Sequence, residues 1–182
     1  MQQRVAKLIL SIVLVSPFTF VASASACDKI SGLSDVNCDG KLRIAVIGDS
    51  IVYGVGDADN SGHGGYVKRI AALMRKVSFA NLGVPGWTTR AMLSKMDKAL
   101  VKGQGPKFAS SVFNADLVIF DIGRNDRWNG VTPQASYRNI RRGISLVKAQ
   151  VLSKMGVEPL VVTSVLLVPN RGSQAPWVRQ LN

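Results

Sequence analysis

The sequence has very little histidine and glutamate. Its 182 residues include a single histidine, His63, and a single glutamate, Glu158. A hydroxyl nucleophile needs a neighbouring base, most often an imidazole, and no histidine follows His63. The chain has no Walker sequence and no internal repeat, which argues against a P-loop nucleotide site and against a repeat architecture. Basic residues are not interleaved with aromatic ones, so a base-stacking nucleic-acid surface is not expected.

Cysteine is also scarce, and its position indicates a compartment. The N-terminus has a basic start, an apolar stretch over residues 8–21 and the small-residue pattern Ala24-Ser25-Ala26. These features predict a signal peptide over residues 1–26 and an extracytoplasmic protein, periplasmic or secreted. In such an oxidising compartment Cys27 and Cys38, which are the only two cysteines, are expected to form a disulfide. The alternatives are a membrane anchor and a lipoprotein with a lipidated Cys27.

Acidic residues are few beside basic ones. There are 23 lysines and arginines against 11 aspartates and glutamates, a net charge of +12 that falls to +10 without the signal peptide. A positive field favours anionic partners. The basic residues are spread along the chain, and the tightest group is Arg138, Arg141, Arg142 and Lys148. We interpret this group as a solvated helix face, with contact to an anionic surface as the alternative.

What the sequence does contain is a regular alternation of strands and helices. It is long enough, and at 47% hydrophobic residues apolar enough, for one domain with a real core. Helical spacing predicts helices over residues 65–76 and 89–101, and the clearest helix begins after Thr132 as N-cap and stops at Gly156. Residues 102–111 are expected to be a polar link. Apolar runs predict strands at residues 42–47, 77–82, 117–122 and 160–168. The alternation predicts a parallel sheet covered by helices on both faces.

Residues with chemical potential follow three of these strands. Gly48-Asp49-Ser50 ends the first strand, Gly86 follows the second, and Gly123-Arg124-Asn125-Asp126 follows the third. Parallel strands end at one edge of a sheet, and ligands bind at that edge in open α/β sheets. We therefore expect Ser50, Gly86 and Asn125 to converge on one pocket, as a nucleophile with two oxyanion donors.

Competing motifs fit less well. Val52 stands where the nucleophile elbow of α/β-hydrolases needs its closing glycine. The sequence Gly54-Val55-Gly56 begins like a dinucleotide-binding loop but lacks the third glycine. Residues 35–40 match the start of an EF-hand calcium loop, yet the twelfth position is Val46 and supplies no carboxylate. We expect a plain turn there, leading into the first strand.

Three blocks of the sequence resemble a known family. Gly48-Asp49-Ser50, then the Asn-x-Gly-x-x-Gly pattern that ends at Gly86, then Gly123-Arg124-Asn125-Asp126, are similar to the first three blocks of the SGNH (GDSL) hydrolases in order, strand context and separation. The resemblance covers about residue 42 to the C-terminus. It implies a flavodoxin-like three-layer α/β/α fold with a parallel sheet. It also implies Ser50 as nucleophile, an oxyanion hole from the amides of Ser50 and Gly86 and the Asn125 side chain, and no metal or organic cofactor.

Each of these roles has a structural alternative. Ser50 could cap a helix or turn, and Asn125 could be a turn residue. Gly86 could serve only the turn after Pro85, and Gly83 is then the rival donor.

Neighbouring residues have expected roles as well. Arg124 stands where the family often has a smaller residue. It could bias the pocket toward anionic substrates, but solvent exposure is the expectation. Asp126 is expected to brace its loop rather than act as a base. Trp87 and Trp128 either wall the pocket or pack in the core.

The family's fourth block, Asp-x-x-His, has no counterpart in this chain. That block supplies the base and its orienting acid after the fifth strand, whereas this sequence stops at Asn182 soon after the fourth predicted strand. His63 lies in the glycine-rich loop after Ser50 and is not carried over to the missing base. We expect a truncated copy of a longer enzyme, with a natural non-catalytic relative as the alternative.

The sequence thus predicts an exported serine esterase or acyl hydrolase, impaired because its Asp/His block is absent. The alternative is a non-catalytic binding module for an acylated glycan or lipid. Residues 1–26 are assigned to the signal peptide, 27–41 to an N-terminal segment with the disulfide, and 42–182 to a C-terminally incomplete hydrolase domain. The expected partner is a small-molecule, lipid or acylated-glycan ester. Nucleic acid is not expected, and a monomer is.

Overall fold

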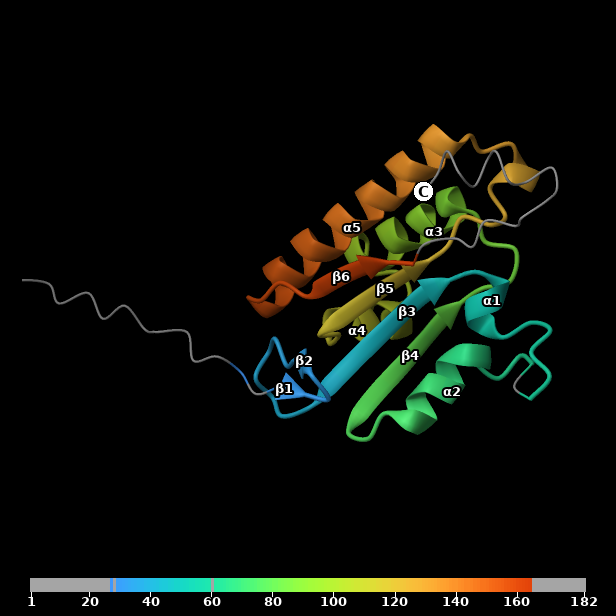
Figure 1. Ribbon diagram of the computed structural model, residues 1–182. Coiled ribbons are helices and arrows are strands. Elements are labelled where there is room, and N and C mark those ends of the chain that lie inside the picture. Colours follow the sequence, from blue (N-terminus) through green and yellow to red (C-terminus); the bar gives the residue numbers. More distant parts are fainter. Residues whose placement is uncertain (1–26, 28, 60, 165–182) are drawn as a thin grey trace, which may run out of the picture.

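A four-stranded parallel sheet forms the centre of the molecule (Figure 1). The structure is a computed structural model that describes residues 27, 29–59 and 61–164. The strands are ordered β4-β3-β5-β6, and every neighbouring pair is parallel. Their bounds are Leu42–Gly48 for β3, Val77–Gly83 for β4, Leu117–Asp121 for β5 and Leu160–Thr163 for β6. The four predicted strands are confirmed, except that residues 165–168 of the last one lie outside the described residues.

Helices cover both faces of this sheet, which confirms the predicted three-layer α/β/α fold. Successive residues of a strand point to opposite faces. Ala45 and Ile47 of β3 therefore belong to a core shared with α3, α4 and α5, whereas Ile44 and Val46 belong to one shared with α1 and α2. The helices are α1 (Ser50–Tyr53), α2 (Gly65–Leu73), α3 (Thr89–Met96), α4 (Pro106–Phe113) and α5 (Pro133–Met155). Burial on both faces explains why β3 and β5 appear in the sequence as continuous apolar runs.

The longest helix, α5, begins and ends where the sequence indicates. The hydroxyl of Thr132 accepts a hydrogen bond from the Ala135 amide at 3.2 Å, and Pro133 occupies the first turn. The helix stops at Gly156, whose φ of +74° is left-handed. The other predicted helices are present too. Residues 89–101 form α3 followed by a π-helical segment, Asp97–Val101, and α2 ends at Leu73, three residues early.

The expected polar link over residues 102–111 is wrong, because it contains most of α4. Gly105 precedes the helix and Pro106 occupies its first turn, a recognised start signal. Phe108 and Val112, which are one helical turn apart, are buried in the core shared with α5. The polar residues between them lie on the outer face of α4. Because the helix is only eight residues long, these polar residues make the apolar side of α4 hard to recognise in the sequence.

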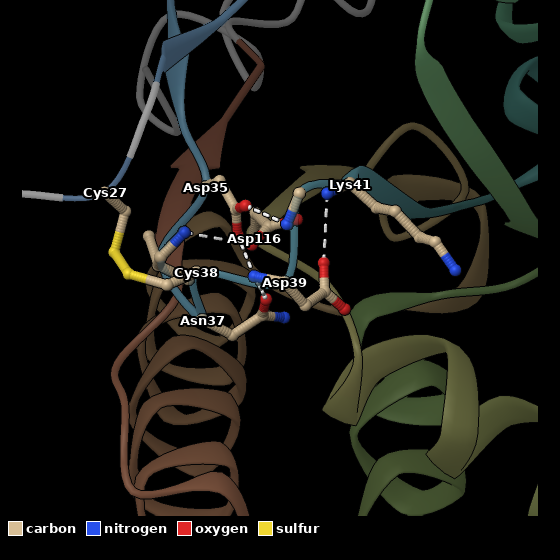
Figure 2. The surroundings of a disulfide bond; sticks show 9 residues. Cys27, Asp35, Asn37, Cys38, Asp39, Lys41 and Asp116 are labelled. Atoms are coloured by element: carbon tan, nitrogen blue, oxygen red, sulfur yellow. Dashed lines mark hydrogen bonds between the residues drawn. A yellow bond between two sulfur atoms is a disulfide. The ribbon is translucent and has the colours of Figure 1, made fainter.

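The N-terminal segment is attached to the amino-terminal end of the sheet. Strands β1 (Lys29–Ile30) and β2 (Leu33–Ser34) form a small antiparallel pair. The predicted disulfide joins Cys27 to Cys38, with the Cα atoms 5.1 Å apart (Figure 2). Asp116, next to β5, accepts hydrogen bonds from the amides of Val36 at 3.0 Å and Arg43 at 2.8 Å. This buried carboxylate therefore ties the segment to the sheet.

The loop that resembles a calcium site is a plain turn. Both oxygens of Asp35 accept backbone hydrogen bonds, from the Asp39 amide at 3.3 Å and the Gly40 amide at 2.7 Å. Asn37 accepts from the same Asp39 amide at 3.1 Å (Figure 2). Among the described residues, no group of histidine, cysteine, aspartate and glutamate side chains is arranged to hold a metal ion. The same residues also include no helix with the length and hydropathy of a membrane span.

Candidate active site

Three strands end level with one another at the carboxyl edge of the sheet. Gly48, at the end of β3, is paired with Gly83 of β4 and with Asp121 of β5. The amide of Val84 continues the ladder by donating to the Gly48 carbonyl at 3.0 Å. The segments that follow these strands therefore all leave from one edge, and these segments carry Ser50, Gly86 and Asn125.

Ser50 is the first residue of the short helix α1. The cap is its neighbour Asp49, whose Oδ1 accepts from the Ile51 amide at 3.0 Å. Ser50 is thus not the capping residue, and its half-buried side chain is not engaged in local structure. Backbone amides in the first turn of a helix have no partner within the helix. The Ser50 amide is accordingly placed where it can serve an oxyanion.

Helix α1 packs directly on the ends of β3 and β4. A Cβ atom at Gly48 would overlap Val52 and the Asp121 carbonyl, and one at Gly83 would overlap the backbone of Tyr53. Only glycine permits this approach. Asn81 fastens the arrangement, because its side-chain amide donates to the Val52 carbonyl at 2.5 Å. Asn81 is the first residue of the Asn-x-Gly-x-x-Gly pattern, and the pattern alone does not indicate this role.

The structure distinguishes the two glycines that compete as oxyanion donors. The Gly83 amide is already engaged, since it donates to Oδ1 of Asn81 at 2.9 Å. Gly86 lies in a turn closed by a 3.2 Å hydrogen bond from the Trp87 amide to the Val84 carbonyl, with φ of +81°. The space beside Gly86 is open to 4 Å. Within the described part of the chain, its amide has no hydrogen-bond partner.

Asn125 connects the loop after β5 to the turn of Gly86. Its Nδ2 donates to the Trp87 carbonyl at 2.9 Å. The carboxamide nitrogen carries a second hydrogen, so this bond leaves one donor unused. The carboxamide of Asn125 and the amide of Gly86 are therefore held on adjoining backbone segments at the edge that carries Ser50.

Asp126 braces its loop, as expected. It is fully buried and accepts hydrogen bonds from the Thr89 amide at 2.7 Å and the Thr89 hydroxyl at 2.5 Å. The hydroxyl of Ser136 also donates to it. One carboxylate thereby joins the start of α3, the loop after β5 and the first turns of α5.

The expectation that Arg124 points to solvent is wrong. Its Nη1 lies 2.8 Å from Oδ1 of Asp121 and 3.7 Å from Oδ2 of Asp49. The arginine side chain is 35% exposed, whereas the side chains of Asp49 and Asp121 are 0% and 5% exposed. Tyr66 and Ser164 also donate to Asp121, each at 2.7 Å. Buried carboxylates attract the guanidinium inward, because an unpaired charge in the interior is costly.

These contacts set the ionisation of Asp49, Asp121 and Tyr66. Burial raises the pKa of Asp49, opposed by the Ile51 amide and by Arg124. Burial acts on Asp121 in the same direction, but hydrogen bonds from Ser164 and Tyr66 and the charge of Arg124 outweigh it and lower the pKa. Burial, and then the hydrogen bond to Asp121, raise the pKa of Tyr66. Tyr66 is therefore a neutral donor to an ionised Asp121.

No described side chain occupies the position of a base. Within the described ranges, nothing forms a hydrogen bond with the Ser50 hydroxyl. His63 is exposed in the loop before α2. Of the two tryptophans considered as pocket walls, Trp87 is partly buried against the core of α3, α4 and α5, whereas Trp128 is 66% exposed. Core packing is thus the role of Trp87, and Trp128 has no core role.

The arrangement defines a class of protein, a three-layer α/β protein with a serine at a helix start and unengaged amide donors at the carboxyl edge of a parallel sheet. The sequence profile of the GDSL-like Lipase/Acylhydrolase family matches residues 46–182. The chain belongs to this family, as the resemblance of its three blocks predicted.

Relatives and solved structures agree with this assignment. The uncharacterized protein YpmR of Bacillus subtilis strain 168 is 37% identical over 89 residues, which are 47% of this chain and 32% of that protein. The match therefore spans about a third of this curated relative. A lipolytic G-D-S-L family protein from Veillonella parvula DSM 2008 has a TM-score of 0.57 at 19% identity, covering 77% of this chain and 68% of that one.

Two further structures have similar scores. The psychrotrophic esterase EstA from Pseudoalteromonas sp. has a TM-score of 0.52 at 16% identity over 76% of this chain and 69% of its own. TesA has a TM-score of 0.52 at 21% identity over 76% and 68%. At these identities the structures establish a shared fold.

Proposed function

We propose that this chain carries the nucleophile and oxyanion hole of an exported esterase or acyl hydrolase, with Ser50 as the nucleophile. The observation that carries the proposal is the level ending of β3, β4 and β5. It brings a serine at a helix start, the unengaged amide of Gly86 and the carboxamide of Asn125 to one edge. Membership of an acylhydrolase family supports the same assignment.

The chemistry follows from these groups. Oγ of Ser50 attacks the carbonyl carbon of an ester and gives its proton to a base, while the carbonyl electrons move to oxygen. The amides of Ser50 and Gly86 and the Nδ2 of Asn125 hold the resulting oxyanion. Collapse of the tetrahedral intermediate expels the alkoxide, which takes the proton from the base and leaves as the alcohol. Water then releases the acid from the acyl-enzyme by the same steps. One fixed oxyanion donor can account for about 10²–10³ in rate.

Substrate and location are part of the proposal. Apolar side chains next to Ser50 are exposed, Ile51 at 43% and Val55 at 50%. They support an ester with an apolar portion, such as a lipid or short acyl ester. The disulfide between Cys27 and Cys38 supports export, because such bonds persist in oxidising compartments. Residues 1–26, the predicted signal peptide, lie outside the described residues.

Chemical rescue tests the function although no described side chain is bonded to Ser50 as a base. Hydrolysis of short p-nitrophenyl esters is measured with and without added imidazole, for the unmodified chain, for Ser50→Ala and for a control, Ser145→Ala, which changes an exposed serine on α5. Imidazole should raise hydrolysis by the unmodified chain and by the control well above hydrolysis by Ser50→Ala. Equal rates for all three proteins would remove Ser50 from the mechanism.

The non-catalytic alternative makes a different prediction. The related EstA has been solved with monoethylphosphonate as inhibitor, and a phosphonate probe also suits Ser50. Covalent labelling that stops in Ser50→Ala supports the hydrolase. Reversible binding of an acylated glycan or lipid, without labelling and without rescue by imidazole, supports the binding module.

A further inference from the structure

The first turns of α5 carry positive charge on their outer face without acidic neighbours, whereas Lys148, further along the helix, pairs with Glu158 at 2.7 Å. The helix has arginines and lysines but no aspartate or glutamate. Arg138, Arg141 and Arg142 are exposed. In the described part of the chain, none of these three forms an ion pair. The segments outside the described residues contain a single acid, Asp28. This positive face is therefore available to an external anion.

Exposed aromatic rings accompany these charges. The guanidinium of Arg141 lies over the ring of Tyr137 at 5.6 Å, and Tyr137 is 51% exposed. The guanidinium of Arg127 lies over the ring of Trp128 at 5.5 Å, and Trp128 is 66% exposed. Tyrosine and tryptophan are amphipathic, and they favour the boundary between lipid chains and water. Arginine binds phosphate through a planar fork of donors.

These residues lie toward the end of the molecule that carries Ser50. Tyr137, Arg138 and Arg141 belong to the first turns of α5, which begins at the carboxyl edge of the sheet (Figure 1). Trp128 belongs to the 3-10 turn Arg127–Asn129, just after Asn125. A flat anionic surface in contact with this face would therefore lie near the site.

We propose that this basic aromatic face, formed by Arg127, Trp128, Tyr137, Arg138, Arg141 and Arg142, docks on the surface of an anionic phospholipid bilayer. The positive charges attract anionic headgroups, and the two rings enter the headgroup region. Duplex DNA or heparin would use the charges and leave the two rings unburied, whereas the headgroup region of a bilayer takes up both the charges and the rings. The proposal does not depend on whether Ser50 is catalytic.

The test is binding of the full chain to phosphatidylcholine vesicles with and without phosphatidylglycerol, measured by sedimentation at low and high salt. The chain should bind only the anionic vesicles, and salt should weaken binding. A cation near an anionic leaflet contributes roughly a fivefold gain in partitioning, so the triple variant Arg138→Gln/Arg141→Gln/Arg142→Gln should bind on the order of a hundredfold more weakly.

Two matched variants separate this face from net charge and from misfolding. Lys68→Gln/Arg75→Gln/Lys76→Gln removes the same charge from exposed residues in and after α2. It should change binding by no more than about threefold, because distant charges are screened. Replacing the three α5 arginines with lysine should retain most of the binding. Equal losses in the two glutamine variants would overturn the proposal, as would failure of the unmodified chain to bind anionic vesicles.

Tryptophan fluorescence identifies the occupant. Anionic vesicles should shift the emission of the chain to shorter wavelength, and the shift should disappear in Trp128→Phe while Trp87 and Trp177 remain. Heparin and duplex DNA are tested in parallel. Binding to these polymers that depends on the α5 arginines, with no Trp128 shift on vesicles, would replace the bilayer with an anionic polymer and overturn the proposal.

Discussion

At the scale of single residues, the candidate site is defined by which polar groups are already in use. Asn81 occupies the Gly83 amide, and Asp49 uses one oxygen to cap α1. The Gly86 amide and one hydrogen of Asn125 are left over at the same edge. An oxyanion is stabilised best by free donors whose surroundings are fixed by other hydrogen bonds, because such donors do not have to reorganise during the reaction.

Asn125 is the donor whose removal is simplest to interpret. Asn125→Ala should lower Ser50-dependent hydrolysis, measured with imidazole, by about 10²-fold, because the oxyanion loses one donor. Asn114→Ala is the control, since Asn114 is exposed beyond the end of α4. An Asn125→Ala protein that folds, by circular dichroism, and retains full hydrolysis would exclude Asn125 from the oxyanion hole.

Arg124 is predicted to stabilise the fold most at neutral pH. Arg124→Gln leaves Asp49 and Asp121 buried without their cation, which raises the pKa of both carboxyl groups in the folded state. A raised folded pKa means that stability falls as pH rises from the ordinary carboxyl range through the folded pKa. The loss of unfolding free energy should therefore be about 2 kcal/mol near pH 7, less than for a fully buried pair because Arg124 is 35% exposed.

Urea unfolding of Arg124→Gln at several pH values measures this loss, with the exposed Arg90→Gln on α3 as control. The deficit relative to the unmodified chain should shrink as pH falls toward 4 and both carboxyl groups become protonated. A deficit that is constant with pH would mean that Arg124 contributes packing rather than charge.

At the scale of elements, one buried carboxylate joins three segments. Asp126 accepts from the amide and hydroxyl of Thr89 at the start of α3 and from Ser136 in α5. These segments are far apart in the sequence, so no local preference holds them together. The carboxylate of Asp126 holds them by hydrogen bonds, and hydrogen bonds to a carboxylate are stronger than those between neutral groups.

Asp126→Ala should therefore destabilise the whole domain. Removing the carboxylate leaves buried donors on Thr89 and Ser136 without an acceptor, and each unsatisfied buried donor costs about 1–3 kcal/mol. We expect a loss of about 3 kcal/mol in unfolding free energy by urea denaturation. Thr132→Ala, which removes only the cap of α5, should cost about 1 kcal/mol. An Asp126→Ala loss no larger than that of Thr132→Ala would contradict the bracing role.

At the scale of the whole molecule, the N-terminal segment is held at the amino-terminal end of the sheet and the candidate site lies at the carboxyl end. The Cys27–Cys38 bond and Asp116 act at the first end. Ser50, Gly86 and Asn125 lie at the second. Stability contributed at the first end can therefore be changed without touching the donors of the site.

The disulfide is expected to stabilise the fold without affecting the site. The cysteines are 11 residues apart, and closing a loop of this size contributes about 2–3 kcal/mol on the chain-entropy model. Cys27→Ser/Cys38→Ser should lower the unfolding free energy by this amount while imidazole-rescued hydrolysis by folded protein is unchanged. Intact-mass analysis with and without reductant verifies the bond, and two free thiols in exported protein would exclude it.

The 182-residue chain alone should be a poor esterase. In the described part of the chain no imidazole is hydrogen-bonded to the Ser50 hydroxyl, which is therefore expected to be a weak nucleophile at neutral pH. In a serine protease that has lost its triad, the oxyanion hole and substrate binding alone still give a rate enhancement of ~10³–10⁴ over the reaction in water. Brisk hydrolysis without added imidazole, abolished by Ser50→Ala, would contradict this prediction. His63→Ala would then identify the base.

Most of the architecture could be predicted from the sequence because its signals are local. Continuous apolar runs identified the buried strands, and Thr132, Pro133 and Gly156 marked the ends of α5 within a residue. The two cysteines lie so close in sequence that their pairing needed no knowledge of the fold. The alternation of strands and helices then predicted a parallel sheet between two layers of helices. Ser50, Gly86 and Asn125 could be predicted as candidate site residues because parallel strands end at the same edge of a sheet.

The features that could not be predicted from the sequence depend on contacts between segments that lie far apart in the chain. Gly83 and Gly86 look equivalent in the sequence. The Asn81 side chain is held by the Val52 carbonyl of α1, and its Oδ1 then occupies the amide of Gly83 and leaves that of Gly86 unengaged. Arg124 appears to be an exposed cation until β3 and β5 bring two buried carboxylates beside it. Helix α4 appears polar in the sequence because it is short, and only the structure shows that Phe108 and Val112 form a side that packs in the core with α5. Local preference fixes where elements begin and end, whereas burial and hydrogen-bond occupancy are properties of residues brought together by folding.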